Sequence, residues 1–524
     1  MKNRFRVKLL ISPKPIVRKA ETLRFPLLGS AFVASYLKKK GIYVEQDDLD
    51  VKSPYLKAFM ESFLKRMSGP TGRIRMEDCL GDRHFNHIIE KILQDTVYTG
   101  FNLIGLSVPE GMPNFTIAVG LAKRIKEETN TPIVLGGRGL PDGTTVLENF
   151  DWIDYVILHR GEKSLFELCK MLESRTSVED KIAGLVYRKN HQVYINKPVF
   201  CYGISHLVPD FEGLPLSSYG YDLGTIVHSI STDPIDEDVS QRDGRKISIF
   251  PHQFIEACAK RCAFCSNSIA KCKVTRPDNV ALGLAQLSRE YGAQYFFFLN
   301  SEINYSYKYA ESLCHEIINR DLDIMWSDSA GLTNLDEKLA AKMRRAGCVR
   351  LWYGVEVASD RMLKFVGKTL TVKQAETGLR ITHQAGIWNG VNLIVGMPYE
   401  TEDDIKRTAE FIQRNREYID IYTLNKFELR PGSRFVEYPE KYGIRFVPQG
   451  MGFEEIDGLN WKEKEEQTQK AYDTLSGIID AKYNMVAWNT HLIFYLYSTM
   501  GSKKEIRKWI GSASEKIKHS AESR

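Results

Sequence analysis

The chain has 524 residues, of which 43% are hydrophobic and 26% are charged, and it contains no tract of low complexity. These values exclude a collagen-like, coiled-coil or wholly disordered chain, and the length suits several domains. Ser502 to Arg524 holds seven basic and three acidic residues, which is four of the six excess positive charges, so the rest of the chain is nearly neutral. We therefore expect no nucleic-acid groove, and we interpret the basic tail as a solvated helix end.

The sequence shows no membrane segment and no secretion signal. The apolar stretch Leu492 to Tyr497 is too short to span a bilayer, and the N-terminus lacks the apolar core and cleavage site of a signal peptide. The nine cysteines are odd in number and mostly far apart, so a disulfide framework is not expected. These features predict a cytoplasmic protein that does not bind membranes.

The first third of the chain alternates short apolar runs with amphipathic stretches. Strands are predicted at Phe5 to Ile11, Ile42 to Gln46, Leu103 to Ser107, Ile133 to Leu135 and Ile153 to Leu158. Helices are predicted at Leu27 to Lys39, Phe115 to Glu128 and Lys163 to Glu173, and a polar helical insert at 48–100. This alternation predicts an α/β domain over residues 1–177, with a parallel, doubly wound sheet.

Turn residues follow three of these strands. Parallel strands present their carboxyl ends at one edge of the sheet, which is where such sheets bind ligands. The two glycines at Gly136 and Gly137 favour a bulky ligand, because residues without side chains let it approach closely. The candidate binding residues at this edge are Ser107, Val108, Gly136, Gly137, Gly161 and Glu162.

The periodicity weakens at 178–245, which we interpret as a linker. It contains a hairpin-like pair, Gly184 to Arg188 and Val193 to Asn196, and then a polar run, Ser231 to Arg245, expected to be a mobile loop. A second alternating series covers 246–438, and residues 439–524 are expected to form a helical C-terminal domain. The strands of the second alternating series are predicted at Ile247 to Phe250, Tyr295 to Leu299, Asp323 to Trp326, Val349 to Val355, Gly390 to Gly396 and Ile419 to Leu424. Six such units predict a partial barrel, (β/α)6.

Three cysteines, Cys258, Cys262 and Cys265, fall within eight residues just after the first strand of this second series. Three thiolates on one loop can ligate three irons of a cubane cluster and leave the fourth iron open to a chelating molecule. The alternative is a structural zinc site, which needs four ligands, and the next cysteine, Cys272, has no partner at knuckle spacing. The spacing therefore favours an iron-sulfur cluster.

This loop resembles the signature of the radical S-adenosylmethionine (SAM) superfamily, including the aromatic residue directly before the third cysteine. Other segments resemble the superfamily in order: Asn300 to Glu302 after the second strand, Glu356 at the end of the fourth, Asn389 to Thr401 around the fifth, and Arg430 to Ser433 after the sixth. The resemblance implies a [4Fe-4S] cluster and S-adenosyl-L-methionine as cofactors. The SAM-contacting residues that it implies are Phe264, Asn300, Ser301, Glu302, Glu356, Val395, Gly396, Leu429 and Pro431.

The first domain resembles the Rossmann-like cobalamin-binding domain of the B12-dependent radical SAM family. This resemblance implies cobalamin as a further cofactor. The sequence lacks the D-x-H-x-x-G motif that supplies a histidine ligand to cobalt in many cobalamin proteins. Asp82 and His84 form part of such a pattern, but no glycine follows at the required place, so we interpret His84 and His87 as residues on a helix surface. Cobalamin binding without a protein histidine, or a relic domain that has lost cobalamin, both remain open.

The family resemblance implies a radical SAM methyltransferase. A 5′-deoxyadenosyl radical would activate an unreactive carbon of a natural-product intermediate or peptide, and methylcobalamin would supply the methyl group. A rearrangement or cyclisation without methyl transfer is the enzymatic alternative, and an iron-sulfur redox module is a third hypothesis. The expected partners are a small-molecule or peptide substrate and an electron donor such as flavodoxin or ferredoxin. Aromatic residues at the C-terminus could contact substrate or form core: Trp461, Tyr472, Tyr483, Trp488, His491, Tyr495 and Tyr497.

Overall fold

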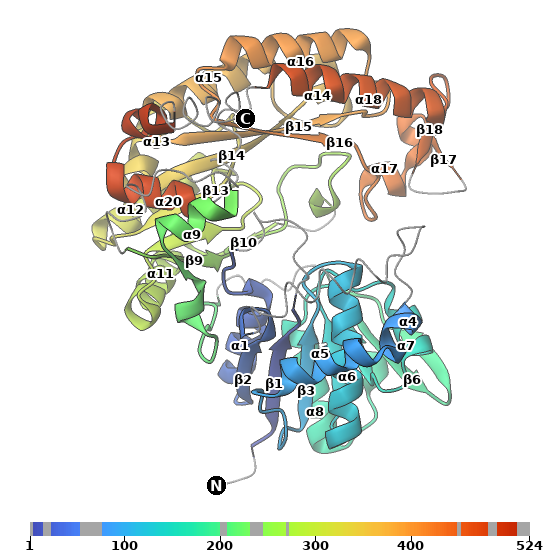
Figure 1. Cartoon of the computed structure of the whole chain (residues 1–524). Coiled ribbons are helices and arrows are strands. Elements are labelled where there is room, and N and C mark those ends of the chain that lie inside the picture. The colour runs from blue at the N-terminus through green and yellow to red at the C-terminus, as the bar shows by residue number, and fades with distance from the viewer. Residues whose placement is uncertain are drawn as a thin grey trace, which may run out of the picture. The chain divides into compact units, whose positions relative to one another are not determined.

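The computed structural model describes residues 4–13, 23–52, 76–199, 207–230, 245–268, 272–447, 452–479 and 490–510. The chain divides into two compact units, Met1–Tyr221 and Asp222–Arg524 (Figure 1). The predicted mobile loop lies almost wholly outside the described residues, as do Tyr483, Trp488 and the last part of the basic tail.

The first unit is built on a sheet with the strand order β2-β1-β3-β4-β5-β6-β7. The strands from β2 to β5 run parallel, and the last two continue the sheet antiparallel. Their bounds are β1 (Arg6–Ile11), β2 (Tyr43–Asp48), β3 (Leu103–Ser107), β4 (Ile133–Gly136), β5 (Tyr155–Ile157), β6 (Leu185–Lys189) and β7 (Gln192–Ile195). All five strands predicted for this region are confirmed to within three residues at each end.

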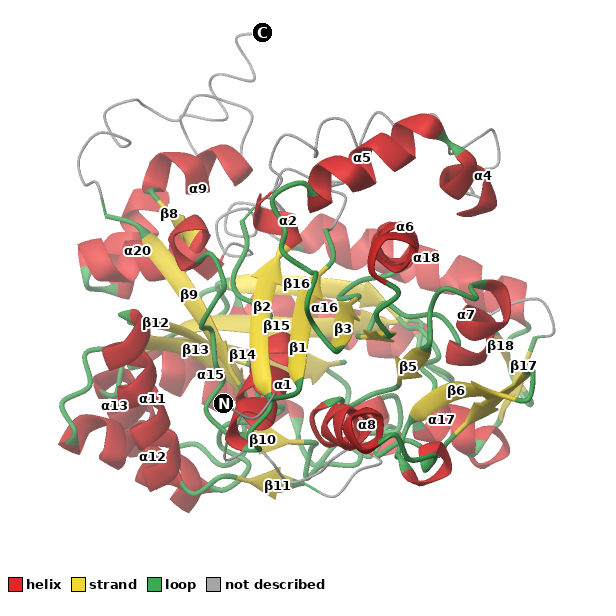
Figure 2. Ribbon diagram, turned by 90° about the horizontal axis from the view of Figure 1, so that it is seen from below, coloured by secondary structure: helices red, strands yellow, loops and turns green. Residues whose placement is uncertain are grey.

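Helices cover both faces of this sheet, which confirms the doubly wound fold (Figure 2). One apolar cluster joins α5, α6 and α7 to one face, and a second joins α1 and α8 to the other. The bounds are α1 (Leu28–Lys39), α2 (Leu49–Lys52), α4 (Met76–Gly81), α5 (Arg83–Leu93), α6 (Met112–Thr129), α7 (Gly143–Asn149) and α8 (Glu162–Ser174). The sequence did not predict α7, because its seven residues are too few for a periodic pattern.

The hairpin predicted at 184–196 exists as β6 and β7, but it belongs to the first sheet. Residues 207–221 also contact this unit, since Gln46 Nε2 donates hydrogen bonds to the carbonyls of Asp210 and Glu212. The first compact unit therefore extends through Tyr221, well into the segment interpreted as a linker. Antiparallel pairing at a sheet edge needs only a short hairpin, and a short hairpin has too weak a period to be assigned to a sheet from sequence.

The second unit contains six parallel strands in the order β16-β15-β14-β13-β12-β9, with a helix following most of them, and so forms the predicted half-barrel. The strands are β9 (Ile247–His252), β12 (Tyr295–Phe298), β13 (Met325–Ala330), β14 (Cys348–Glu356), β15 (Trp388–Val395) and β16 (Ile421–Lys426). The helices are α9 (Leu223–Ile230), α11 (Pro277–Tyr291), α12 (Tyr307–Asn319), α13 (Glu337–Arg345), α14 (Asp360–Phe365), α15 (Val372–Gln384), α16 (Glu402–Asn415), α17 (Arg434–Glu437), α18 (Trp461–Ile478) and α20 (Thr490–Met500).

Local sequence fixes where the long helices of this unit begin. Thr371, Thr401 and Asn460 each cap a helix, and in each case the third helical residue bonds back to the capping residue. Such reciprocal capping satisfies backbone N–H groups that the helix itself cannot pair. Two short ribbons accompany the half-barrel: β10 (Ile255–Glu256) pairs with β11 (Lys273–Val274), and β17 (Ile444–Phe446) with β18 (Phe453–Glu455). The latter ribbon interrupts the region predicted to be helical.

Buried residues of the segment 490–510 are part of the core of this unit. Every residue of α20 from His491 to Tyr497 is buried, and the helix packs against α9, β9 and β14. Lys503 is 5% exposed and lies 2.6 Å from the Asp420 carboxylate, which Arg507 also contacts at 2.7 Å. The interpretation of this segment as a solvated helix end is therefore wrong for the face that carries Lys503, Ile506 and Ile510, whereas Lys504, Glu505 and Lys508 are exposed. A charge count could not reveal that one buried aspartate neutralises two of the basic side chains.

Candidate functional site

The three cysteines lie on a loop between the strands of the β10–β11 ribbon. Ala263, in the middle of the loop, is 1% exposed. Its N–H donates to the Val366 carbonyl at 2.8 Å, and its own carbonyl accepts from the Phe435 N–H at 3.1 Å. These bonds fix the loop to the segment after α14 and to α17, while Cys258 and Cys265 stay partly exposed.

The thiols are close enough to influence one another. Burial raises the pKa of the Cys258 and Cys262 thiols, and the charge of Cys265 acts on both in the same direction. Lys368 opposes this rise at Cys262. Among the described residues, no three Cys, His, Asp or Glu side chains are placed to hold a single metal ion. A cubane cluster binds each thiolate to a different iron, so the donor set fits such a cluster.

Asn300 positions the strand that leads into the loop. Its side-chain oxygen accepts hydrogen bonds from the N–H groups of Phe254 and Ile255 at 3.0 and 2.9 Å. Its amide nitrogen donates to Asp328 at 2.7 Å. The Asn300 amide is thus occupied by bonds within the protein, whereas the sequence placed this residue among the SAM contacts. Ser301, beside it, is partly exposed.

Two buried carboxylates at the ends of β12 and β14 each pair with a lysine. Glu302 lies 3.1 Å from Nζ of Lys260, which belongs to the cysteine loop. Glu356 lies 3.1 Å from Nζ of Lys368. Glu356 also has a φ of 69°, a left-handed conformation that is rare for residues other than glycine and that often marks a functional site. The half-barrel therefore gathers two carboxylates and two ammonium groups beside the cysteine loop.

The remaining predicted SAM contacts lie near the same strand ends. Val395 and Leu429 are buried, and Phe264 packs on the apolar cluster that contains Leu429, whereas Pro431 is exposed. Gly396 has a φ of 86°, and a β-carbon there would lie 2.4 Å from Thr468 of α18. Packing of α18 therefore gives a structural reason for this glycine.

The aromatic residues of α20 are not near the cysteine loop. Arg350, in the first half of β14, donates to Thr490 Oγ1 at 3.0 Å, and the Tyr497 hydroxyl donates to the Gly386 carbonyl just before β15. Both contacts lie toward the amino ends of the strands, opposite the ends that carry the carboxylates. His491, Tyr495 and Tyr497 therefore form core.

In the first unit, the two loops that follow β3 and β4 pack tightly against each other. Val108 N–H donates to the Gly136 carbonyl at 2.7 Å, and Gly139 N–H donates to the Val108 carbonyl at 2.9 Å. Gly137 has a φ of 123°, and a β-carbon there would lie 2.2 Å from the Val108 carbonyl oxygen. Backbone packing thus requires Gly137, independently of any ligand.

Other residues at this edge have partners within the protein. The Ser107 carbonyl accepts from the Ser12 hydroxyl, and the Asn114 amide donates to Ser12 and to the Pro13 carbonyl. Gly161 precedes α8, and the buried Glu162 lies 2.8 Å from Arg160. Asn114 ties the loop after β1 to α6, and a lone asparagine in an apolar stretch gave no signal in the sequence.

The partial D-x-H pattern is explained by helix capping. Asp82 accepts the Phe85 N–H at 2.9 Å and begins α5. His84 and His87 are exposed on that helix, as the sequence predicted.

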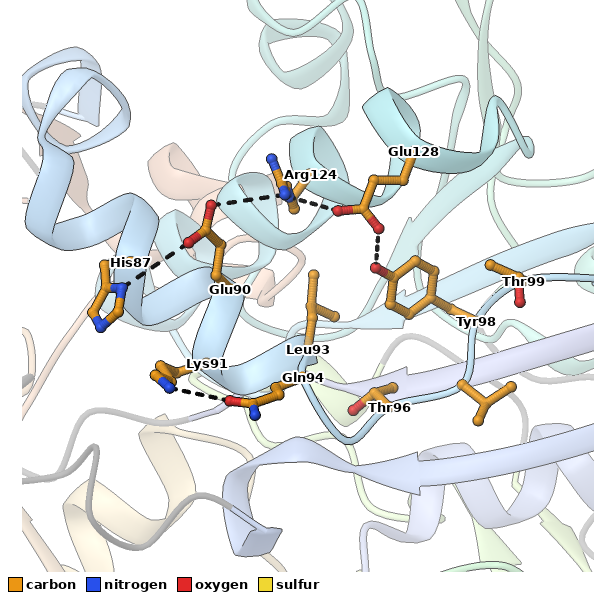
Figure 3. Close-up of a pocket in the computed structure, with 11 residues that line it drawn as sticks. His87, Glu90, Lys91, Leu93, Gln94, Thr96, Tyr98, Thr99, Arg124 and Glu128 are labelled. Carbon is orange, nitrogen blue, oxygen red and sulfur yellow. Dashed lines mark hydrogen bonds and ion pairs between the residues drawn. The ribbon is translucent and has the colours of Figure 1, made fainter.

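A surface pocket of about 660 Å³ lies beside His87, between α5, α6 and the segment before β3 (Figure 3). Arg124 at its wall is neutralised by Glu90 and Glu128, at 3.7 and 2.7 Å. The segment Thr96 to Thr99, which lines the pocket, leads into the amino end of strand β3. The pocket is therefore remote from the carboxyl edge at which the candidate cobalamin residues lie.

Comparison with known families identifies the class of protein. Residues 253–412, which contain the cysteine loop and both carboxylates, match the Radical SAM superfamily. This segment of the chain is therefore a radical SAM domain.

Sequence similarity to other proteins covers most of the chain. An uncharacterized methyltransferase of Pyrococcus horikoshii is 25% identical over 399 residues, covering 72% of this chain and 81% of that protein. The anaerobic magnesium-protoporphyrin IX monomethyl ester cyclase of Rubrivivax gelatinosus is 25% identical over 312 residues, covering 57% of this chain and 52% of that protein.

Two solved structures share the fold of both units. The radical SAM methyltransferase TsrM of Kitasatospora setae, solved with cobalamin and a [4Fe-4S] cluster, has a TM-score of 0.60 at 18% identity and covers 91% of this chain and 89% of that one. The cobalamin-dependent enzyme OxsB, solved with aqua-cobalamin and S-adenosylmethionine, has a TM-score of 0.56 at 16% identity, covering 96% and 62%. In the described residues, no helix is both long and apolar enough to cross a membrane.

Proposed function

We propose that the chain is a cobalamin-dependent radical SAM methyltransferase, acting on an unactivated carbon of a natural-product intermediate or peptide. Two features of the chain together support this proposal. The cysteine loop lies beside two carboxylates at strand ends, and a doubly wound unit shares the fold of TsrM. When bound, the cluster and S-adenosylmethionine supply radical chemistry, and methylcobalamin supplies the methyl group.

The residues of the chain have distinct roles in this proposal. Cys258, Cys262 and Cys265 hold the cluster, and the backbone bonds of Ala263 keep their loop in place. Glu302 and Glu356 bind the amine and the ribose of S-adenosylmethionine, and the fixed loops after β3 and β4 support cobalamin. Because His84 and His87 lie on the exposed face of α5, cobalt would have no ligand from them.

The ribose contact of Glu356 gives a measurable prediction. Glu356→Ala should weaken S-adenosylmethionine binding by about 1.5 to 3 kcal/mol, the range for hydrogen bonds to a charged group. Isothermal titration of the cluster-loaded protein measures this loss, and Glu410→Ala, on the exposed surface of α16, is the control. Unchanged affinity would show that Glu356 does not touch the ribose.

Methyl transfer can be tested before the substrate is known. The anaerobic, reconstituted chain is mixed with cob(I)alamin, whose cobalt supplies the electron pair of the new bond, and S-adenosylmethionine labelled in its methyl group. The sulfonium methyl should pass to cobalt, giving labelled methylcobalamin and one equivalent of S-adenosylhomocysteine. Mass spectrometry detects both products. Once a substrate is supplied, turnover should form S-adenosylhomocysteine and 5′-deoxyadenosine in near-equal amounts. No labelled methylcobalamin would contradict a methyltransferase.

A cyclisation or rearrangement without methyl transfer is the second candidate. It is supported by the likeness to the magnesium-protoporphyrin ester cyclase, although the chain spans about half of that protein. Such an enzyme should form 5′-deoxyadenosine without stoichiometric S-adenosylhomocysteine. Either reaction needs a one-electron donor, for which flavodoxin or ferredoxin is proposed.

A further inference from the structure

Lys368 is a buried ammonium group held against the cysteine loop. Its side chain is 10% exposed, and Nζ lies 6.0 Å from the centre of the Phe264 ring. It follows directly after Val366 and Gly367, and the Val366 carbonyl accepts the N–H of Ala263 in the loop. A backbone bond two residues away therefore holds this segment beside the loop, and the ion pair with Glu356 at 3.1 Å holds the ammonium group.

Glycine at position 354 makes room for the ion pair of Lys368 with Glu356. A β-carbon on Gly354 would lie 2.1 Å from Glu356 Oε1 and 2.9 Å from Lys368 Nζ. Both side chains are about one-tenth exposed, so water screens them little. The fold thus places one positive and one negative charge at defined positions near Cys262 and Phe264.

We infer that Lys368 is a positioning residue that raises the reduction potential of a cluster on Cys258, Cys262 and Cys265, and that Glu356 lowers it. This inference rests on the proposed function only in requiring that the loop binds a [4Fe-4S] cluster. Reduction of the cluster from the 2+ to the 1+ state adds one electron and no proton. A fixed cation stabilises the added negative charge, and a fixed anion opposes it.

The test compares reduction of the cluster in six forms of the full chain without S-adenosylmethionine: wild type, Lys368→Met, Lys368→Arg, Glu356→Gln, the Lys368→Met/Glu356→Gln double variant and Lys364→Met. Lys364 is the matched control, because it is an exposed lysine in the last turn of α14, four residues earlier. Dithionite supplies the electron, and the electron paramagnetic resonance signal of the reduced cluster is followed against solution potential.

Opposite shifts are the expected signature. At a fixed potential, the ratio of reduced to oxidised cluster should fall roughly tenfold in Lys368→Met, as expected for loss of one charge about 10 Å away at an effective dielectric constant of about 20. The ratio should rise in Glu356→Gln, lie between the two in the double variant, and stay within about twofold of wild type in Lys364→Met. Lys368→Arg, which retains the charge, should restore the wild-type potential.

Several outcomes would overturn the inference. Equal potentials in wild type and Lys368→Met, or shifts of the same sign in the two single variants, would exclude the electrostatic role. If Lys368→Met assembles no cluster, the potentials of Glu356→Gln and Lys368→Arg test the inference instead. A reduction potential of Glu356→Gln at or below that of wild type would then overturn it. A wild-type chain without iron would instead overturn the proposed function, and the iron count separates that failure from the others.

Discussion

Replacing Cys262 with alanine should abolish the iron-sulfur cluster. The reconstituted wild-type chain is expected to hold about four iron atoms, and Cys262→Ala close to none, because the other two thiolates of the loop cannot hold a cubane. Cys262 is the most deeply buried of the three, at 9% exposure, so a thiol from solvent replaces it poorly. Iron analysis and the visible charge-transfer absorption measure the loss.

Cys272→Ala is the informative control for this experiment. Cys272 is partly exposed, and its pKa is raised by burial and by the charge of Cys258, so the structure brings it near the loop. With an open fourth iron, Cys272→Ala should keep the full iron content and S-adenosylmethionine binding. Loss of metal in this variant as well would indicate a four-cysteine site, and zinc in place of iron would contradict radical chemistry.

The strands of both units could be predicted because buried parallel strands are short, apolar and separated by helical periods. The strand β3 has the predicted bounds, and β14 differs from its prediction by one residue at each end. Strand β13 begins two residues later than predicted, because Asp323 and Ile324 precede the paired region. The short ribbon β17–β18 was missed, since three-residue strands carry no measurable period.

The cysteine loop could be recognised from its spacing, but its electrostatic surroundings could not be predicted. Lys368 lies twelve residues after Glu356, in the connection between α14 and α15, and no pattern of residue types marks it as a partner. Lys260 lies within the cysteine loop, where no residue pattern marks it as the partner of Glu302. Its pairing with Glu302 depends on the end of β12 lying beside the ribbon, which is a tertiary contact. Ion pairs between distant segments are fixed by the fold rather than by local sequence.

The two glycines after β4 show how one sequence feature can have two physical causes. From the sequence, we predicted that Gly136 and Gly137 both make room for a bulky ligand such as cobalamin. In the structure, a β-carbon on Gly136 would find its nearest neighbour, the Ile157 carbonyl oxygen, at an ordinary 3.8 Å. Gly137 instead faces the Val108 backbone at 2.2 Å and has a φ that side chains disfavour. The positions therefore predict different responses to the same substitution.

Gly137→Ala should separate the loops after β3 and β4 and should release cobalamin. The combined clash and backbone strain should destabilise this region by roughly 2 to 4 kcal/mol, because the colliding atom belongs to the backbone and cannot rotate away. Hydrogen exchange of the β3 and β4 amides should become faster, and the cobalamin absorption should be lost on gel filtration.

Gly136→Ala is the matched variant at the neighbouring position and should retain both amide protection and cobalamin. If the cofactor itself needs the space at both glycines, Gly136→Ala will lose cobalamin while its amides stay protected. Slow exchange in Gly137→Ala would instead show that the two loops tolerate a side chain between them. His84→Ala and His87→Ala, on the exposed face of α5, should leave the cobalamin spectrum unchanged, and a changed spectrum would assign the cobalt ligand to that helix.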